Sequence, residues 1–230
     1  MSARVRRTTQ PRSGKSVIVD SAVHRFRERG YHATTMREIA DGAAINVASI
    51  YHHFPDGKQG VLRQIMADTL RDHLALTREA VLDAGSSATA QLAAVVRAWI
   101  LFHTTRQAEA LIGATEMRSL EGPGRELVVA LRDQQEQLFR EVVRRGVGTG
   151  EFATPTPTAA ARAVIAMGTS VSAWYRADGA ERAEDLAETY VDLALATVRA
   201  APRPATPPDT APVTELDTEP DRAPSERAFP

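Results

Sequence analysis

Apolar residues recur at three- and four-residue intervals along most of the chain, which is the pattern of amphipathic helices. After Lys58 one such stripe continues to Leu82 and predicts a helix of about 25 residues. No segment shows the alternating pattern of a β-strand. The pattern therefore predicts an all-α fold. Further helices are expected over residues 14–29, 92–103, 109–120, 128–143, 159–176 and 183–200.

Two more helices, both short, are predicted after the first. Thr35 precedes Glu38 by three residues, which is the spacing of a capping box. Asn46 is a good N-cap residue for a second helix that starts at Val47. Two short helices joined by a tight turn form a helix-turn-helix, whose second helix enters the major groove of DNA. Residues 13–58 are therefore expected to form a three-helix DNA-binding domain.

This region also carries two blocks of residues in a fixed order: RGYHATTMREIA over 29–40 and NVASIYHHF over 46–54, followed by Lys58. These blocks resemble the DNA-binding signature of the TetR family of transcriptional regulators. Ala44 stands where the family usually has glycine in the turn. Lys58 comes one residue later than usual, an insertion that Gly57 can absorb.

The resemblance implies a set of DNA-binding residues in the two short helices. Ser49, Tyr51 and Lys58 are implied to contact phosphates, as is Thr35, while the others are the side chains most free to read base edges. Tyr51 packing only against its own domain, or His52 merely facing solvent, are the alternatives. The full set is Thr35, Arg37, Val47, Ala48, Ser49, Tyr51, His52 and Lys58.

By the same resemblance, residues 59–200 should form a helical-bundle domain for ligand binding and dimerisation. Two-fold pairing would place two recognition helices about one DNA turn apart on a palindromic operator. The segment 159–176 is apolar on two sides, so one side would pack on its own domain and the other on a partner chain. A single-chain core without a partner is the alternative. The residues expected at the dimer interface are Val164, Ile165, Gly168, Val171, Ser172, Tyr175, Tyr190 and Leu193.

A small-molecule effector is expected to bind this domain and to shift the protein between DNA-binding and released states. The residues expected to line its pocket are Trp99, Phe102, His103, Met117, Gln135, Phe139 and Trp174. His103 or Gln135 would either anchor a polar group of the effector or be satisfied inside the core. The stretch WYRADG over residues 174–179 is similar to one in family members that sense acyl-CoA thioesters, and its alternative role is to close a helix. A lipophilic or acyl-CoA-like effector is therefore expected.

The net charge of −1 says nothing about DNA, but the distribution of charge is uneven. Residues 1–60 hold ten Arg or Lys against five Asp or Glu, whereas residues 201–230 hold three against six. Residues 1–12 are either a disordered basic arm or an arm that adds DNA contacts. Residues 201–230 contain eight of the thirteen prolines and are expected to be a disordered tail.

Other functions find little support in the sequence. There is no cysteine, and the six histidines lack ligand spacing, so neither a metal nor another cofactor is expected. No Gly-x-Ser-x-Gly elbow is present, which disfavours the alternative of an all-helical enzyme. The absence of a long apolar run argues against a membrane partner and favours the cytoplasm. The expected function is a ligand-responsive regulator, more often a repressor in this family, and the other alternative is an effector-blind DNA-binding architectural protein.

Overall fold

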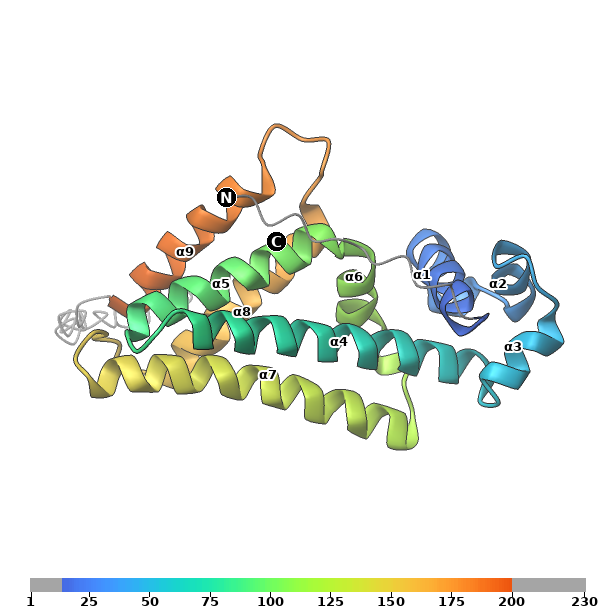
Figure 1. Cartoon of the computed structure of the whole chain (residues 1–230), viewed down its shortest axis with the longest axis horizontal. Coiled ribbons are helices and arrows are strands. Elements are labelled where there is room, and N and C mark those ends of the chain that lie inside the picture. Colours follow the sequence, from blue (N-terminus) through green and yellow to red (C-terminus); the bar gives the residue numbers. More distant parts are fainter. Residues whose placement is uncertain (1–13, 200–230) are drawn as a thin grey trace, which may run out of the picture.

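The computed structural model describes residues 14–199, and every regular element in that range is helical (Figure 1). The basic arm over residues 1–12 and the tail over residues 201–230 lie outside the described residues. The all-α expectation is confirmed. The elements are α1 (Gly14–Ala33), α2 (Met36–Gly42), α3 (Val47–His53), α4 (Gly57–Asp83), α5 (Ala88–Thr105), α6 (Gln107–Thr115), the 3₁₀ helix η1 (Glu116–Ser119), α7 (Gly122–Gly148), α8 (Pro157–Trp174) and α9 (Ala183–Arg199).

The helix-turn-helix forms with the caps that the sequence predicts. Thr35 caps α2, and its hydroxyl accepts a hydrogen bond from the Glu38 amide (3.2 Å) while the Glu38 carboxylate accepts one from the Thr35 amide (2.8 Å). Asn46 caps α3 by accepting from the Ser49 amide (2.7 Å). Each cap satisfies a backbone donor that a helix start leaves free.

A core of apolar side chains holds the DNA-binding end together but is not confined to it. This N-terminal core contains Ile18, Phe26, Ile39 and Ile50 from α1–α3, and it continues into α4 with Leu62 and neighbouring residues. Ile112 of α6, Leu120, and Val128 of α7 complete it. In Figure 1, α1–α3 lie at one end of the molecule, and α4 runs from there along α7 into the rest of the bundle.

The second core fills the bundle formed by α4, α5, α7, α8 and α9, with α5 packed against all four of the others. Its largest fully buried side chain is Phe139. The N-terminus of α5 is held by Glu151, whose carboxylate accepts hydrogen bonds from the Ala88 amide (3.0 Å) and the Thr89 amide (2.9 Å). These backbone donors hold the pKa of Glu151 at about 2, well below its usual value. The anchored α5 carries three side chains of the cavity described below.

The structure differs from the predicted elements in two places. The helix expected over residues 109–120 is split into α6 and η1. Gly122-Pro123-Gly124 interrupts the apolar pattern. It forms the first residues of α7, whereas the helix there was expected to begin at residue 128. Proline fits the first turn of a helix because the amide it lacks has no intrahelical partner there.

Candidate DNA-binding and effector sites

One face of the recognition helix α3 is anchored in the N-terminal core and the other is free. Ile50 is fully buried and Phe54, just beyond the helix, is 4% exposed. On the opposite side Ala48 and His52 are exposed, and Tyr51 is 48% exposed. The Tyr51 ring therefore covers Gly57 on one side and leaves about half of its surface open to a partner.

The remaining residues of the predicted DNA surface lie beside these or at helix starts. Thr35 and Arg37 are exposed, while Val47 and Ser49 are partly exposed. The hydroxyl groups of Thr35 and Ser49 already take part in caps, since Thr35 Oγ1 bonds Glu38 (2.9 Å) and Ser49 Oγ donates to the Asn46 side chain (2.9 Å). Because a hydroxyl has one proton and a phosphate oxygen only accepts, each hydroxyl would have to turn that proton from its present partner to make the predicted phosphate contact.

The ammonium group of Lys58 binds its own chain, in contrast to the direct phosphate contact that the resemblance implies. Its ammonium donates to the carbonyl oxygens of Tyr31 (2.8 Å), His32 (3.3 Å) and Thr34 (2.8 Å) and sits 4.4 Å from the centre of the Tyr31 ring. Burial lowers its pKa, and Glu116 partly offsets that effect. Because an ammonium has three donors, this geometry makes Lys58 the group that fixes the start of α4 to the end of α1.

Two unusual backbone conformations shape the DNA-binding end. Ala44, in the turn between α2 and α3, has a φ of 55°, in the left-handed region that glycine adopts more easily. Gly57, at the start of α4, has a φ of 60°, a conformation that glycine adopts without the penalty that a Cβ brings.

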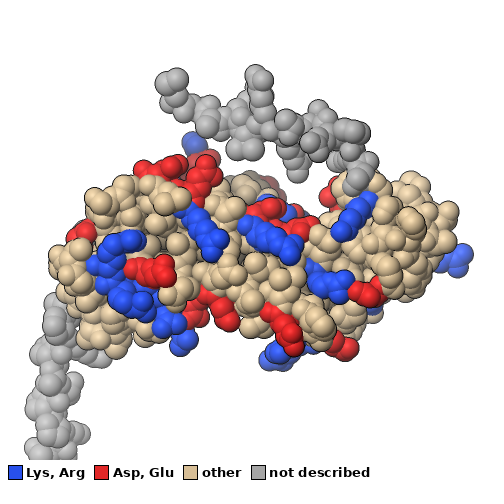
Figure 2. Space-filling model, turned by 60° about the horizontal axis from the view of Figure 1, so that its bottom comes forward, with Lys and Arg blue, Asp and Glu red and all other residues tan. Residues whose placement is uncertain are grey.

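Charge on the described part of the DNA-binding end is nearly balanced. Six of the ten basic residues of the first sixty lie at or after residue 14, together with all five acidic ones. Figure 2 shows basic and acidic side chains interspersed over the face it presents. The excess positive charge that favours DNA therefore comes from Arg4, Arg6, Arg7 and Arg12, all outside the described residues.

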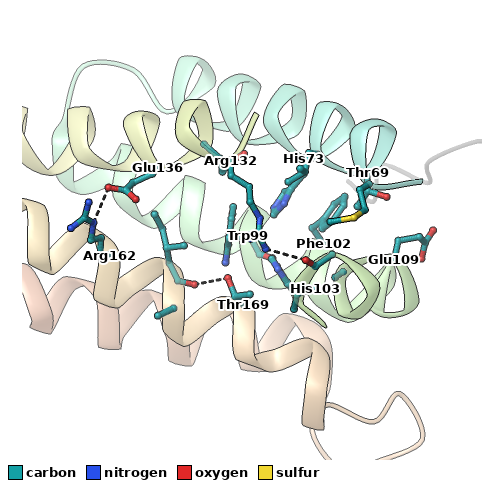
Figure 3. Close-up of a pocket in the computed structure, with 18 residues that line it drawn as sticks. Thr69, His73, Trp99, Phe102, His103, Glu109, Arg132, Glu136, Arg162 and Thr169 are labelled. Carbon is teal, nitrogen blue, oxygen red and sulfur yellow. Dashed lines mark hydrogen bonds and ion pairs between the residues drawn. The ribbon is translucent and has the colours of Figure 1, made fainter. Parts of the chain in front are cut away.

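A cavity of about 310 Å³ lies between α4, α5, α6, α7 and α8 (Figure 3). We call it the central cavity. Met66, Leu70, Trp99, Phe102 and Ile165 give it largely apolar walls. Its polar and charged lining groups are Thr69, His73, His103, Glu109, Arg132, Gln135, Glu136, Arg162 and Thr169.

Two histidines in the wall are uncharged. His73 stacks between Trp99 and Phe102, with ring centres 4.2 and 3.8 Å apart, and burial lowers its pKa to about 2. His103 donates from Nδ1 to the Trp99 carbonyl oxygen (2.8 Å), and burial lowers its pKa to about 4. Neutral imidazoles suit an apolar cavity because each keeps one donor and one acceptor without carrying a buried charge.

Four of the seven residues predicted for the pocket line the central cavity: Trp99, Phe102, His103 and Gln135. Gln135 has a partner inside the protein, because its Nε2 donates to Thr77 Oγ1 (3.0 Å). The other three predictions were wrong. Phe139 is fully buried edge-on against Trp99, Met117 packs against the N-terminal core, and Trp174 is 48% exposed at the end of α8.

Sequence reasoning missed several lining residues, above all His73 and Arg132. A signal was present, since His73 lies three residues after Leu70 on the apolar stripe of α4, and Arg132 lies four residues after Val128 on α7. Polar residues at apolar stripe positions indicate either a satisfied core group or a ligand site, and the spacing alone does not separate the two.

Most of the predicted dimer residues are buried within their own chain. Val164, Gly168, Val171, Ser172 and Tyr175 are buried, and Ile165 lines the central cavity. At Gly168 a side-chain Cβ would lie 2.3 Å from the Trp99 ring, so this glycine allows α8 to approach α5. The five buried residues leave no surface for a partner, whereas Ile165 and Tyr190 are partly exposed and Leu193 is exposed.

The stretch over residues 174–179 forms the end of α8 and the turn after it, outside the lining of the central cavity. Gln107 of α6 holds this end by donating to the carbonyl oxygens of Ser172 (2.9 Å) and Tyr175 (2.6 Å). Arg176 and Asp178 pair with each other in the turn (3.2 Å). This geometry matches the alternative role of closing a helix.

The central cavity and the DNA-binding end share α6, which continues directly into η1. Ala110 and Gly113 of α6 line the cavity, while Ile112 of the same helix is buried in the N-terminal core. Immediately beyond, the Ser119 carbonyl accepts from Gln59 Nε2 (2.6 Å), and Ser119 Oγ lies 3.1 Å from His32 Nε2. A change in the cavity wall can therefore reach α1 and α4 through directly bonded groups.

Searches for two other kinds of site gave negative results within residues 14–199. No three His, Asp or Glu side chains there are grouped so as to hold a metal ion. None of the helices in that range combines the length and the apolar character required to cross a membrane.

The fold and these sites define a helix-turn-helix regulator with a separate cavity-bearing domain. The family model for bacterial regulatory proteins of the tetR family matches residues 18–65, and the model for the tetracyclin repressor-like C-terminal domain matches residues 85–198. The chain belongs to the TetR family of transcriptional regulators, which are DNA-binding proteins and not enzymes.

Three similar proteins illustrate the family. The HTH-type transcriptional repressor KstR2 of Mycolicibacterium smegmatis is 28% identical over 83% of this chain and 93% of its own. The structure of a tetR-family regulatory protein from Rhodococcus RHA1 has a TM-score of 0.78 at 28% identity, covering 83% of this chain and 99% of that one. AibR in complex with isovaleryl coenzyme A and operator DNA has a TM-score of 0.72 at 25% identity, covering 79% and 97%.

Proposed function

We propose that the protein is a homodimeric, cytoplasmic transcriptional repressor that binds a palindromic operator through α3 and is released by a small lipophilic effector in the central cavity. The observation that carries this proposal is the apolar cavity itself, which shares α4 and α6 with the core of the DNA-binding end. An architectural protein that ignores small molecules has no need for such a cavity. The similarity to KstR2, a repressor, supports the sign of regulation.

For DNA recognition we propose that α3 enters the major groove with its exposed side chains on base edges and phosphates. Ala48 and His52 are placed to read bases, and Tyr51 to bind a phosphate. Thr35 and Arg37 of α2 would add contacts beside them. Two such helices would lie about 34–36 Å apart, or a multiple of that distance, on the two halves of the operator.

For dimerisation we propose the exposed side of α8 and α9. Trp174 is 48% exposed and Leu193 is 46% exposed, and both are large apolar side chains. Between them the exposed side of α8 presents Ala163, Ala166 and Ser170, which are small enough to let a partner helix come close. This replaces the buried face that the sequence suggested.

For the effector we propose a lipophilic or acyl-CoA-like molecule. The apolar walls of the cavity suit an acyl chain, and AibR, with isovaleryl coenzyme A bound, supplies a family precedent. The stretch over residues 174–179 does not support this choice of effector, since it lies outside the cavity lining.

The first experiment is selection of binding sites from random DNA, followed by release of the selected operator by acyl-CoA thioesters of different chain length. We expect an inverted repeat and release by at least one thioester. Selection of DNA without a repeat would contradict the dimeric operator complex, and an operator complex that no small molecule affects would favour the architectural protein.

Substitutions at the DNA surface test the docking directly. Tyr51→Phe should weaken binding to every sequence by about ten- to a hundredfold, the effect of one lost hydrogen bond to a charged group, while His52→Ala should change the preference among operators. Lys58→Ala should also weaken all binding. A direct phosphate contact by Lys58 would lower the salt dependence by about one ion, whereas loss of its bonds to the carbonyl groups would leave that slope unchanged. A Tyr51→Phe variant with wild-type affinity would contradict this docking.

A further inference from the structure

Arg132 is a positively charged group in the central cavity without a negative partner. In Figure 3 its side chain extends from α7 into the space between Trp99, His73 and His103. One Nη atom donates to the Gly113 carbonyl oxygen of α6 (3.1 Å). Among the described residues it forms no ion pair, and burial alone lowers its pKa.

The other charged groups of the cavity lining are already paired. Glu109 binds Arg106 (3.1 Å), and Glu136 binds Arg162 (2.9 Å). The cavity therefore has one unbalanced charge, and that charge is positive. A half-buried guanidinium with a single carbonyl partner is costly, because it has lost water and gained no countercharge.

A second group in the same wall also lacks a partner. His73 is 3% exposed, and its Nε2 has no hydrogen-bond partner in the described part of the chain. The ring is neutral, so this nitrogen accepts or donates one hydrogen bond according to its tautomer. Trp99 Nε1 in the same wall likewise has no hydrogen-bond partner in the described part of the chain, so two buried ring nitrogens beside Arg132 are unsatisfied within otherwise apolar and aromatic surroundings.

The size of the cavity limits what can bind beside these groups. A volume of about 310 Å³ corresponds to about ten water molecules at liquid density. A medium-chain or aryl-alkyl acid is of similar size. Its apolar part would contact Trp99, Phe102 and Ile165, which also line the cavity.

From these observations we propose that the central cavity recognises a small apolar carboxylate, whose two oxygens are held by the guanidinium of Arg132. This inference rests on the proposed function, since it specifies the effector of the same site. Arginine suits the role because its fork of N–H donors matches both oxygens of a carboxylate. A carboxylate there supplies the countercharge that Arg132 lacks and competes for the donors that now bind Gly113 on α6.

The test is calorimetric titration of the full-length protein with matched pairs of probes: octanoate against octanamide, and 4-phenylbutyrate against 4-phenylbutyramide. Each pair has the same apolar part and differs in charge. We expect at least one carboxylate to bind the wild type about tenfold or more tightly than its amide, as a charge-assisted bidentate pair requires. Arg132→Met, which keeps an unbranched apolar stem but removes the guanidinium, should abolish the preference. Arg125→Met, at an exposed arginine of the same helix, should keep it.

Three results would overturn the inference: equal binding of acid and amide, a preference that survives in Arg132→Met, or no binding of either acid at millimolar concentration. Operator release by octanoyl-CoA separates this inference from the proposed function. Release of the operator by this thioester, which has no free carboxylate, together with equal binding of acid and amide would leave the proposed function standing and refute the role of Arg132.

Discussion

At the residue scale, Ala44 shows how a single backbone angle bears on the helix-turn-helix. Its φ of 55° places a Cβ-bearing residue in the left-handed region, at the turn that orients α3 against α2. Ala43, immediately before it, has an ordinary φ of −86°. Glycine substitutions at the two positions therefore test the same rule, because glycine relieves backbone strain at Ala44 and relieves none at Ala43.

We expect Ala44→Gly to stabilise the protein by up to about 1 kcal/mol. Removal of a left-handed penalty of about 1–2 kcal/mol outweighs the extra freedom that glycine gives the unfolded chain, which costs about 0.4–1 kcal/mol. Ala43→Gly should destabilise by about 0.5–1 kcal/mol because it gains the freedom without relieving strain. Denaturant unfolding of the two variants measures the difference, and equal losses in both would show that the turn is unstrained.

Lys58 illustrates what residue patterns leave undetermined. The sequence places it beside the recognition helix, and the resemblance implies a phosphate contact. Its three bonds to the carbonyl groups of residues 31, 32 and 34 depend on where α1 ends, which is set by the turn at Gly30. The sequence pattern alone does not distinguish a lysine that joins two helices from one that contacts DNA.

At the element scale, α6 and η1 form the short segment through which the two parts of the molecule meet. One side of α6 lines the central cavity, and η1 bonds the DNA-binding end through Ser119. The sequence predicted a single helix here and gave no reason to connect it with Gln59, which is sixty residues away along the chain.

We expect operator binding to slow amide hydrogen exchange in residues 113–120 of the wild type. In Gln59→Leu, which loses the 2.6 Å bond to the Ser119 carbonyl, this protection should fall by about two- to thirtyfold, the range of a coupling of about 0.5–2 kcal/mol. Gln64→Leu is the matched control, because Gln64 bonds only Asp68 on its own helix. Equal protection in all three proteins would mean that η1 does not respond to DNA.

The helices themselves could largely be predicted, because their apolar stripes and caps are local. The faces they turn to one another could not. In α8 both sides are apolar, and the choice between core and surface depends on Trp99, whose ring occupies the space at Gly168. The lining of the cavity has the same origin, since Phe139 shares a face of α7 with Arg132 but lies two turns further along, where it is buried against Trp99.

At the scale of the whole molecule, the proposed function requires two copies to act together. Leu193 lies on the surface of α8 and α9 that we propose for the partner. Leu193→Glu would place a charge where the interface is expected to exclude water. The dimer dissociation constant should rise by at least about tenfold, with a loss of operator affinity, because one recognition helix alone binds weakly.

Sedimentation equilibrium and operator titration on the same samples measure both effects. The control is Leu82→Glu, at a leucine of α4 that is 79% exposed and outside that surface. Unchanged association of the Leu193 variant would move the interface elsewhere on the molecule.

The N-terminal core also has a consequence for engineering. Because it draws Leu62 and its neighbours from α4, together with Ile112, Leu120 and Val128 from later helices, residues 13–58 do not make a self-contained module. A chimaera that exchanges only those residues with another regulator would bring side chains from two different proteins into contact inside the N-terminal core, where they would pack poorly. A chimaera with transferred DNA specificity would also need the matching core side chains of three further helical segments. Changes on the exposed side of α3 are therefore a simpler route to a new operator than exchange of the whole DNA-binding end.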